Sequence, residues 1–259
     1  MVNCILWTLS LSVSLSLGAL HDIEHKFPDF VAPSDECAQA AKRLNCKIHR
    51  SIEFENLVMN CSNCGIQSEE LHHFENCTTG IQNLDLSENG IEFLSYLPNM
   101  VDLKDLHLEH NRIVHLNNIP PIIQLEQLFL NANRINDLTG ISSFVPNILN
   151  LNLADNRITS VTPLTPLLKL MKLNLERNSI ISAVGLPLRG YMQRLNLNQN
   201  KITSPKGIPP NVRTLDHSFN NITSLVELGR LKNLMWLNLS HNEISSLKGF
   251  NTGSCFFFI

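Results

Sequence analysis

Several features are scarce in this sequence of 259 residues, and each scarcity excludes a class of protein. Positive charge is not in excess, because 20 Lys and Arg stand against 23 Asp and Glu, for a formal net charge of -3. Nucleic-acid binders and polybasic membrane binders carry a basic excess, so we expect neither activity. No apolar run approaches the roughly 20 residues that span a bilayer, so we expect no membrane span. Trp and Tyr number only two each.

Catalytic and metal-binding motifs are also missing. The sequence holds no nucleophile elbow, phosphate-binding loop, metalloprotease helix or kinase motif, so we predict that the protein is not an enzyme and uses no cofactor. Cys61-x-x-Cys64 has the spacing of zinc ligands, and His72 and His73 follow it. Because no second pair of this kind accompanies it, we prefer disulfides to a metal site.

Leu and Asn, by contrast, are abundant, with 42 and 31 copies. Asn is disfavoured inside both helices and strands. Its excess therefore indicates a turn that demands Asn and that recurs along the chain.

The N-terminal residues predict secretion. Residues 5–17 form an apolar run interleaved with Ser, too short to cross a bilayer, and no charged residue precedes His21. This is typical of a cleaved secretory signal, which we place at residues 1–20, with a linker at 21–36. The n-region lacks Lys and Arg, so an N-terminal extension of a cytosolic protein is the alternative.

Cysteine usage favours an oxidising compartment. Five cysteines crowd into residues 37–77, where they would form a disulfide-bonded cap, assigned to residues 37–80. Four N-x-S/T sequons suit a glycosylated, extracellular protein; they lie at Asn60, Asn76, Asn221 and Asn238.

One phrase, L-x-L-x-x-N-x-I, recurs eight times from Ile81 onward, each copy preceded by an apolar residue and two variable ones. Its spacings, counted between the Asn residues, are 22, 22, 23, 22, 22, 20 and 22. The eight copies begin at Leu84, Leu106, Leu128, Leu151, Leu173, Leu195, Leu215 and Leu237, and their Asn residues are Asn89, Asn111, Asn133, Asn156, Asn178, Asn200, Asn220 and Asn242.

This pattern resembles the leucine-rich repeat family, in the short repeat type found in a protein phosphatase 1 regulatory subunit and in bacterial internalins. The resemblance implies an α/β solenoid, a horseshoe with a parallel sheet on its concave face and 3₁₀ or short helical turns on its convex face. We assign eight repeats to residues 81–253.

The Cys-rich segment is similar to the N-terminal cap of extracellular leucine-rich repeat proteins. Met59, Cys61, Cys64 and Ile66 align with the repeat's two Leu, its Asn and its Ile. From this similarity we expect Cys37 and Cys46 to pair with Cys61 and Cys64, in a connectivity that the sequence leaves open.

Strand geometry explains the repeated letters. Alternate side chains point to opposite faces, so both Leu of L-x-L enter the core and the residue between them faces solvent. The Asn amide, with donors and an acceptor, would satisfy the buried backbone of the turn, so the eight Asn form a structural ladder. His217 replaces the second Leu of its copy, and we expect it to be buried and hydrogen-bonded.

The last residues, 254–259, form an apolar tail. The repeat register places Phe256 on the apolar residue that precedes a ninth copy and Ile259 on the first Leu of that copy. We therefore expect a truncated ninth repeat of a longer protein. Stacked coils would separate Cys255 from the N-terminal cysteines by about 35–40 Å, too far for a disulfide. Cys255 or Cys77 could instead link two chains as a dimer.

The solvent-facing strand residues are the candidates for binding. Most are small and polar, and the aromatic exceptions resemble the anchors of protein interfaces. We predict that a protein ligand binds the concave face, and that a glycan on Asn238 would block its C-terminal end; the candidate contact residues are Phe129, Trp236, Phe219, His107, Asp105 and Arg194.

A basic row is expected along one edge of the solenoid. Arg112, Arg134, Arg157 and Lys201 each follow a ladder Asn and could meet sulfated glycans or acidic lipids. The interpretation we prefer is solvated charge, neutralised by nearby acids such as Glu109 and Asp155.

Two functional hypotheses follow. The resemblance implies a secreted or receptor-ectodomain binding protein, in innate immunity or cell adhesion, that recognises a protein on its concave face. The alternative is an intracellular scaffold or phosphatase-regulatory subunit, which the short repeat type also resembles.

Overall fold

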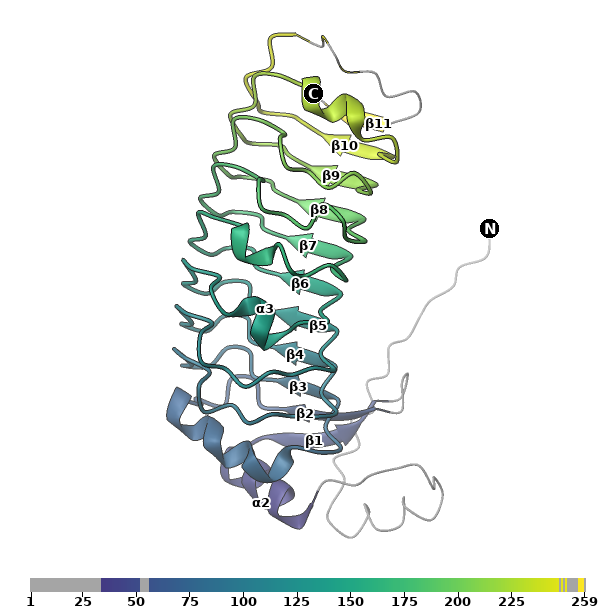
Figure 1. The fold of residues 1–259 in the computed structure, drawn as a ribbon. Helices are drawn as coiled ribbons and strands as arrows, with labels where there is room; N and C mark the ends of the chain where they lie inside the picture. The colour runs from purple at the N-terminus through teal and green to yellow at the C-terminus, as the bar shows by residue number, and fades with distance from the viewer. Residues whose placement is uncertain (1–33, 52–55, 247, 249, 251–255, 259) are drawn as a thin grey trace, which may run out of the picture.

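The computed structural model describes residues 34–51, 56–246, 248, 250 and 256–258. Its main feature is one sheet of 11 strands that follow one another in chain order, from β1 to β11 (Figure 1). β1 and β2 form an antiparallel hairpin, and the ten strands from β2 onward are parallel to their neighbours. The strands are β1 Lys47–Arg50, β2 Leu57–Asn60, β3 Asn83–Asp85, β4 Asp105–His107, β5 Gln127–Phe129, β6 Asn150–Asn152, β7 Lys172–Asn174, β8 Arg194–Asn196, β9 Thr214–Asp216, β10 Trp236–Asn238 and β11 Phe256–Phe258.

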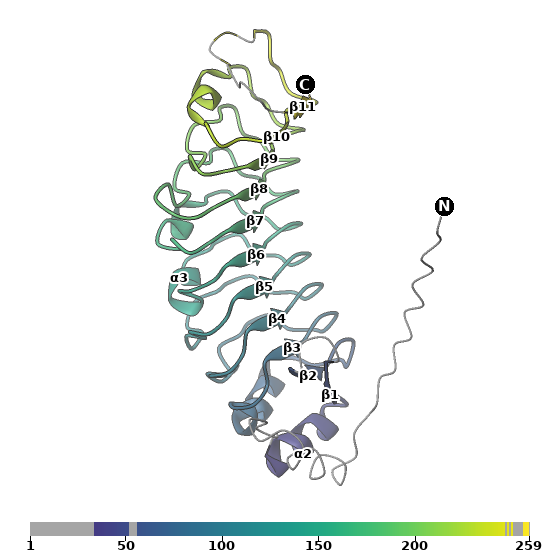
Figure 2. The same cartoon turned by 90° about the vertical axis from the view of Figure 1, so that its right-hand side faces the viewer.

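Short helical turns lie on the side of the solenoid opposite the sheet (Figure 2). They are α3 Ile141–Phe144, η2 Thr162–Leu164 and η3 Val226–Arg230, where η denotes a 3₁₀ helix. The prediction of a horseshoe-shaped α/β solenoid with a parallel sheet and short turns is therefore confirmed.

The core is a continuous stack of equivalent residues. In the strand register the first Leu of each copy faces the first Leu of the next, as Leu84, Leu106 and Leu128 do. These Leu side chains are at most 2% exposed throughout the eight copies. Because each coil buries its apolar edges only against its neighbours, stability accumulates along the stack.

The eight Asn of the repeat hold each coil to the one before it. The Oδ1 atom of Asn133 accepts from the N–H of Ile113, 2.9 Å away, and its Nδ2 donates to the carbonyls of Leu108 and Leu130 at 2.9 and 3.1 Å. Equivalent bonds to the preceding and the same coil recur at the other seven Asn. We call these residues the asparagine ladder.

The N-terminal end of the stack is covered by α2 (Asp35–Arg43), the β1–β2 hairpin and η1 (Ser68–Cys77). The hydroxyl of Ser34 accepts from the N–H of Cys37 at 3.1 Å and caps α2. Two disulfides join these elements, Cys37–Cys77 with Cα atoms 4.8 Å apart and Cys46–Cys61 with Cα atoms 4.3 Å apart.

Two expectations about cysteine were wrong. Cys64 is a free thiol, because the other four described cysteines pair with one another; its N–H donates to Asn89 Oδ1 and its Sγ lies 3.3 Å from the carbonyl of Asn45. Cys77 takes its place opposite Cys37, since η1 carries Cys77 onto α2. Cys77 therefore does not link two chains, and Cys255 lies outside the described residues.

His217 is buried as expected, with no exposed surface, but the expected hydrogen bond is absent. Neither ring nitrogen has a hydrogen-bond partner among the residues that the structure describes. The side chain occupies the position of the second Leu, and the equivalent residues of the two neighbouring coils, Leu197 and Leu239, are buried apolar side chains that offer no hydrogen-bond partner. Burial lowers the pKa of His217 to about 3, so the imidazole is neutral in the fold.

The ninth strand begins in a different register from the expected one. β11 pairs with β10 so that Phe257, rather than Ile259, stands opposite Leu237. The step between these two residues is 20 positions, the same as the step from Leu195 to Leu215 between β8 and β9. The signal segment (1–20), most of the linker, and Cys255 and Ile259 of the tail lie outside the described residues.

Candidate functional site: the concave face of the sheet

The last residues of the strands from β2 to β10 lie side by side across the sheet, and we call them the central column. Most of these residues serve the fold. In seven of the nine, the side-chain Oδ1 accepts from the N–H two residues later, at 2.9–3.2 Å. These are Asx turns, which fix the chain as it leaves each strand. The seven residues are Asn60, Asp85, Asn152, Asn174, Asn196, Asp216 and Asn238. We expected the solvent-facing strand residues to be candidates for binding and did not predict this structural role; the recurrence of Asn or Asp in the column was the available signal.

His107 and Phe129 are the exceptions in this column, and they are neighbours on β4 and β5. Their rings stack with centroids 4.5 Å apart and planes 13° apart. Both side chains are half-buried. Neither side chain can form an Asx turn, so the local backbone does not account for a ring side chain at these two positions.

His107 is held by a carboxylate beside it. Its Nδ1 lies 3.1 Å from Oε1 of Glu109. Burial alone would lower the pKa of His107, but the hydrogen bond to Glu109 and the nearby negative charges of Glu109, Asp85 and Asp105 outweigh it, so the pKa is raised. Burial likewise opposes ionisation of Glu109, yet His107 holds the pKa of that carboxyl below its usual value.

A hollow of about 490 Å³ extends across the concave face from Phe129 on β5 to Trp236 on β10. Lys172 and Arg194 line its middle, directly opposite each other on β7 and β8. Both are exposed, and neither forms an ion pair with any described residue. Like charges on facing strand residues repel, so this pair lowers stability unless an anion binds it.

The structure sorts the predicted contact residues into three groups. Phe129, Trp236 and Arg194 line the hollow together, and Lys172, which the sequence analysis did not select, joins them. His107 and Asp105 lie on β4 next to Phe129 but do not line the hollow.

Phe219 does not lie on the concave strands. It belongs to the turn after β9, where the residue before each ladder Asn adopts a left-handed backbone with φ between 50° and 56°. Its ring stacks on His241 of the next coil, with centroids 4.0 Å apart. The prediction that Phe219 lies on the concave face is wrong, because this left-handed conformation turns the side chain onto the edge.

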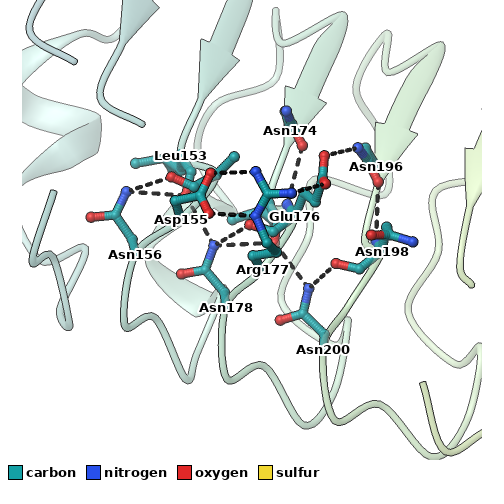
Figure 3. Close-up of polar contacts among 12 residues, drawn as sticks. Leu153, Asp155, Asn156, Asn174, Glu176, Arg177, Asn178, Asn196, Asn198 and Asn200 are labelled. Carbon is teal, nitrogen blue, oxygen red and sulfur yellow. Dashed lines mark hydrogen bonds and ion pairs between the residues drawn. The ribbon is translucent and has the colours of Figure 1, made fainter. Parts of the chain in front are cut away.

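An ionic cluster occupies the same edge in the middle of the stack (Figure 3). Arg177 donates from Nη2 to Oδ2 of Asp155 at 2.7 Å and from Nη1 to Oε1 of Glu176 at 2.8 Å, and its Nε donates to Asp155 as well. The second oxygen of Glu176 accepts from Asn196 at 3.1 Å. The hydrogen bonds from Arg177 lower the pKa of Asp155, so both carboxylates are engaged within the cluster.

Two further findings concern cofactors and membranes. Among the residues that the structure describes, no group of three His, Cys, Asp or Glu side chains is placed to hold a metal ion. Within the same ranges, no helix has the length and apolarity needed to cross a bilayer.

The stacked coils, the parallel strands carrying L-x-L and the asparagine ladder define a leucine-rich repeat fold. Solved structures of this class resemble it across most of its length. Internalin C2 of Listeria monocytogenes matches with a TM-score of 0.60 and 20% identity, covering 92% of this chain and 94% of that one. The leucine-rich repeat domain of APL1B has a TM-score of 0.66 and 21% identity, covering 78% and 63%. TLR13, in complex with ssRNA13, has a TM-score of 0.61 and 22% identity, covering 70% and 31%.

These likenesses concern the fold. No protein-family model matches the sequence, and no curated protein matches it.

Proposed function

We propose that this protein is an extracellular leucine-rich repeat protein that binds a protein ligand on its concave face, in defence or cell adhesion. The hollow between Phe129 and Trp236 carries the proposal, because it combines two aromatic side chains with Lys172 and Arg194, cations that form no ion pair with any described residue. Aromatic residues and Arg dominate the energetics of protein interfaces. Most other side chains of the central column, to which Phe129 belongs, are engaged in Asx turns, whereas Phe129 cannot form one.

An open face of this kind suits binding better than catalysis. The hollow lies on the surface of a single sheet, whereas catalytic sites usually enclose the substrate and exclude water. The proposal therefore assigns the protein to the binding modules rather than to the enzymes.

The disulfides support the extracellular location, because such bonds persist in oxidising compartments. The sequons differ in accessibility. Asn76 and Asn221 are exposed. Asn60 and Asn238 are half-buried, and their side-chain amides bond Asp85 and Asp216, respectively.

Expression of the chain in a secretory cell line should therefore yield secreted protein glycosylated at Asn76 and Asn221. We expect Asn60 and Asn238 to be largely unmodified, because their side chains are half-buried; the Asn221 amide also donates a hydrogen bond, to Glu243 at 2.8 Å, but it lies at the exposed surface. Glycopeptide mapping of the secreted protein measures all four sites. Retention in the cytosol as reduced, unglycosylated protein would contradict the location and favour the intracellular scaffold.

The proposed interface predicts a large loss of affinity when either aromatic anchor is removed. Phe129→Ala and Trp236→Ala should each weaken partner binding about 30-fold, as expected for a loss of about 2 kcal/mol at an interface anchor. The partner is first captured from extracellular fluid with the wild type, and its dissociation constant is then measured by surface plasmon resonance.

Val184→Ala is the matched control. Val184 is 51% exposed and occupies the repeat position that begins η2 in the preceding coil, opposite the sheet. This variant should bind as the wild type does. Equal affinities for all three variants would move the interface away from the concave face.

A further inference from the structure

Three arginines form a row along one edge of the solenoid, apart from the concave hollow. Arg112, Arg134 and Arg157 each directly follow a ladder Asn, in three successive coils. Their N–H groups make equivalent bonds, to the carbonyls of Ile91, Ile113 and Ile135 at 2.8–2.9 Å. The backbone therefore presents the three side chains in the same way, about 4.8 Å apart from coil to coil. We call these residues the arginine row.

No ion pair neutralises the arginine row within the described part of the chain. All three side chains are exposed, and none forms a hydrogen bond or ion pair with another residue in the described ranges. The acids that we expected to neutralise them form ion pairs with other residues. Glu109 pairs with His107, and Asp155 pairs with Arg177 (Figure 3). Neutralisation by Glu109 and Asp155 was therefore the wrong interpretation.

A second hollow, of about 570 Å³, lies beside the arginine row. Arg112 and Arg134 line it together with His110 and the ladder residue Asn111, and Glu88 is the single acid among its lining residues. None of its lining residues belongs to the hollow between Phe129 and Trp236. The hollow thus holds two arginines against one acid, whereas the whole chain has a net charge of -3.

We propose that the arginine row and this hollow form a binding site for a sulfated glycan. The guanidinium group presents a planar fork of donors that suits tetrahedral oxyanions, and three forks spaced along a line match a polymer with anionic groups along its length. Sulfate groups keep their charge at all physiological pH values, so the site would act throughout that range.

Two observations favour a glycan over a nucleic acid. Single-stranded nucleic acids are bound largely by stacking of bases on aromatic side chains, and no Phe, Tyr or Trp lines this hollow in the described part of the chain. The disulfides of the N-terminal cap favour the extracellular space, where sulfated glycans occur. This choice of ligand rests on the proposed extracellular location, but not on the proposed concave interface.

Calorimetric titration of the full-length secreted protein tests the site. The probes are a heparin-derived dodecasaccharide, the same oligosaccharide after desulfation, and a single-stranded oligouridylate of similar charge. The row variant is Arg112→Ser/Arg134→Ser/Arg157→Ser. The control, Arg43→Ser/Arg189→Ser/Arg213→Ser, removes three exposed arginines from other parts of the surface and changes the net charge equally.

The wild type should bind the sulfated oligosaccharide and not the desulfated one. The row variant should bind at least about tenfold more weakly, a loss of about 1.4 kcal/mol, while the control stays within about twofold of the wild type. Replacing all three residues by Lys, which keeps the charge but loses the fork, should give an intermediate affinity. Unchanged thermal melting of each variant establishes that its fold is intact.

Three results would overturn the inference: no preference for the sulfated oligosaccharide, equal losses in the row and control variants, or tighter binding of the oligouridylate through the same arginines. Phe129→Ala and Trp236→Ala should bind the oligosaccharide as the wild type does. A failure of the concave interface would therefore leave the glycan result intact, and the reverse also holds.

Discussion

Asn133→Ala should lower the free energy of unfolding by about 3–5 kcal/mol, which is a large part of the stability of a typical domain. The substitution removes one small side chain that is 8% exposed and leaves the N–H of Ile113 without its partner. The carbonyls of Leu108 and Leu130 each lose one of two amide donors and keep the other, from Asn111 and Asn156. A buried polar group without a hydrogen bond costs about 1–3 kcal/mol, and water has little access to this layer.

Asn174→Ala is the matched control for the ladder. Asn174 is half-buried, and its amide oxygen accepts one hydrogen bond, from the N–H of Glu176 at 3.1 Å. Its loss should cost about 1 kcal/mol. Urea denaturation followed by circular dichroism gives both values. A loss at Asn133 no greater than that at Asn174 would show that the ladder does not carry the stability we assign to it.

His217 should make the protein less stable in acid. The imidazole is neutral in the fold, with a pKa of about 3, whereas the ordinary value in the unfolded chain is about 6.5. Its contribution is therefore constant above pH 6.5 and falls as the pH drops from 6.5 towards 3, because the unfolded chain gains a proton that the fold rejects. At pH 5 the loss amounts to about 2 kcal/mol.

His217→Leu should remove this dependence and restore the residue found at the same position in the other copies. Since the imidazole nitrogens have no partners among the described residues, the variant should also be more stable at pH 7.5, by about 1–3 kcal/mol. The midpoints of urea unfolding at pH 7.5 and pH 5.0 measure both effects. The exposed His115→Gln serves as the control and should keep the acid sensitivity of the wild type. An equal fall in stability between the two pH values for His217→Leu and the wild type would contradict this account.

The periodic part of the fold was predictable because each coil repeats the same physical problem. Leu alternation sets which residues enter the core, and the recurring Asn fixes where the chain must turn. The interruptions were harder to predict. His217 has the donors and acceptor of any other His, and only its apolar neighbours in the coils above and below deprive it of partners.

Contacts between non-equivalent segments could not be predicted from the repeat. The pairing of Cys37 with Cys77 depends on how η1 docks on α2, which no periodic pattern encodes. The charge pairs posed the same problem. Asp155 is two residues from Arg157 in sequence, yet it bonds Arg177 in the next coil because the left-handed turn presents Arg177 to it.

The candidate site was only partly predictable for a related reason. Phe129, Trp236 and Arg194 were selected as exceptions to a polar surface, and they line one hollow. Lys172 was not selected, because its significance comes from facing Arg194 across the strand register without an acidic partner. Such a pair emerges only when the coils are stacked.

Site-specific photo-cross-linking tests the central claim, that the concave face binds the protein partner, most directly. A benzophenone amino acid is placed at Phe129 in one protein and at Val184, opposite the sheet, in another. After irradiation in the presence of the captured partner, we expect a covalent complex from position 129 and none from position 184. A complex from position 184 together with none from position 129 would contradict the claim and place recognition on the other side of the solenoid.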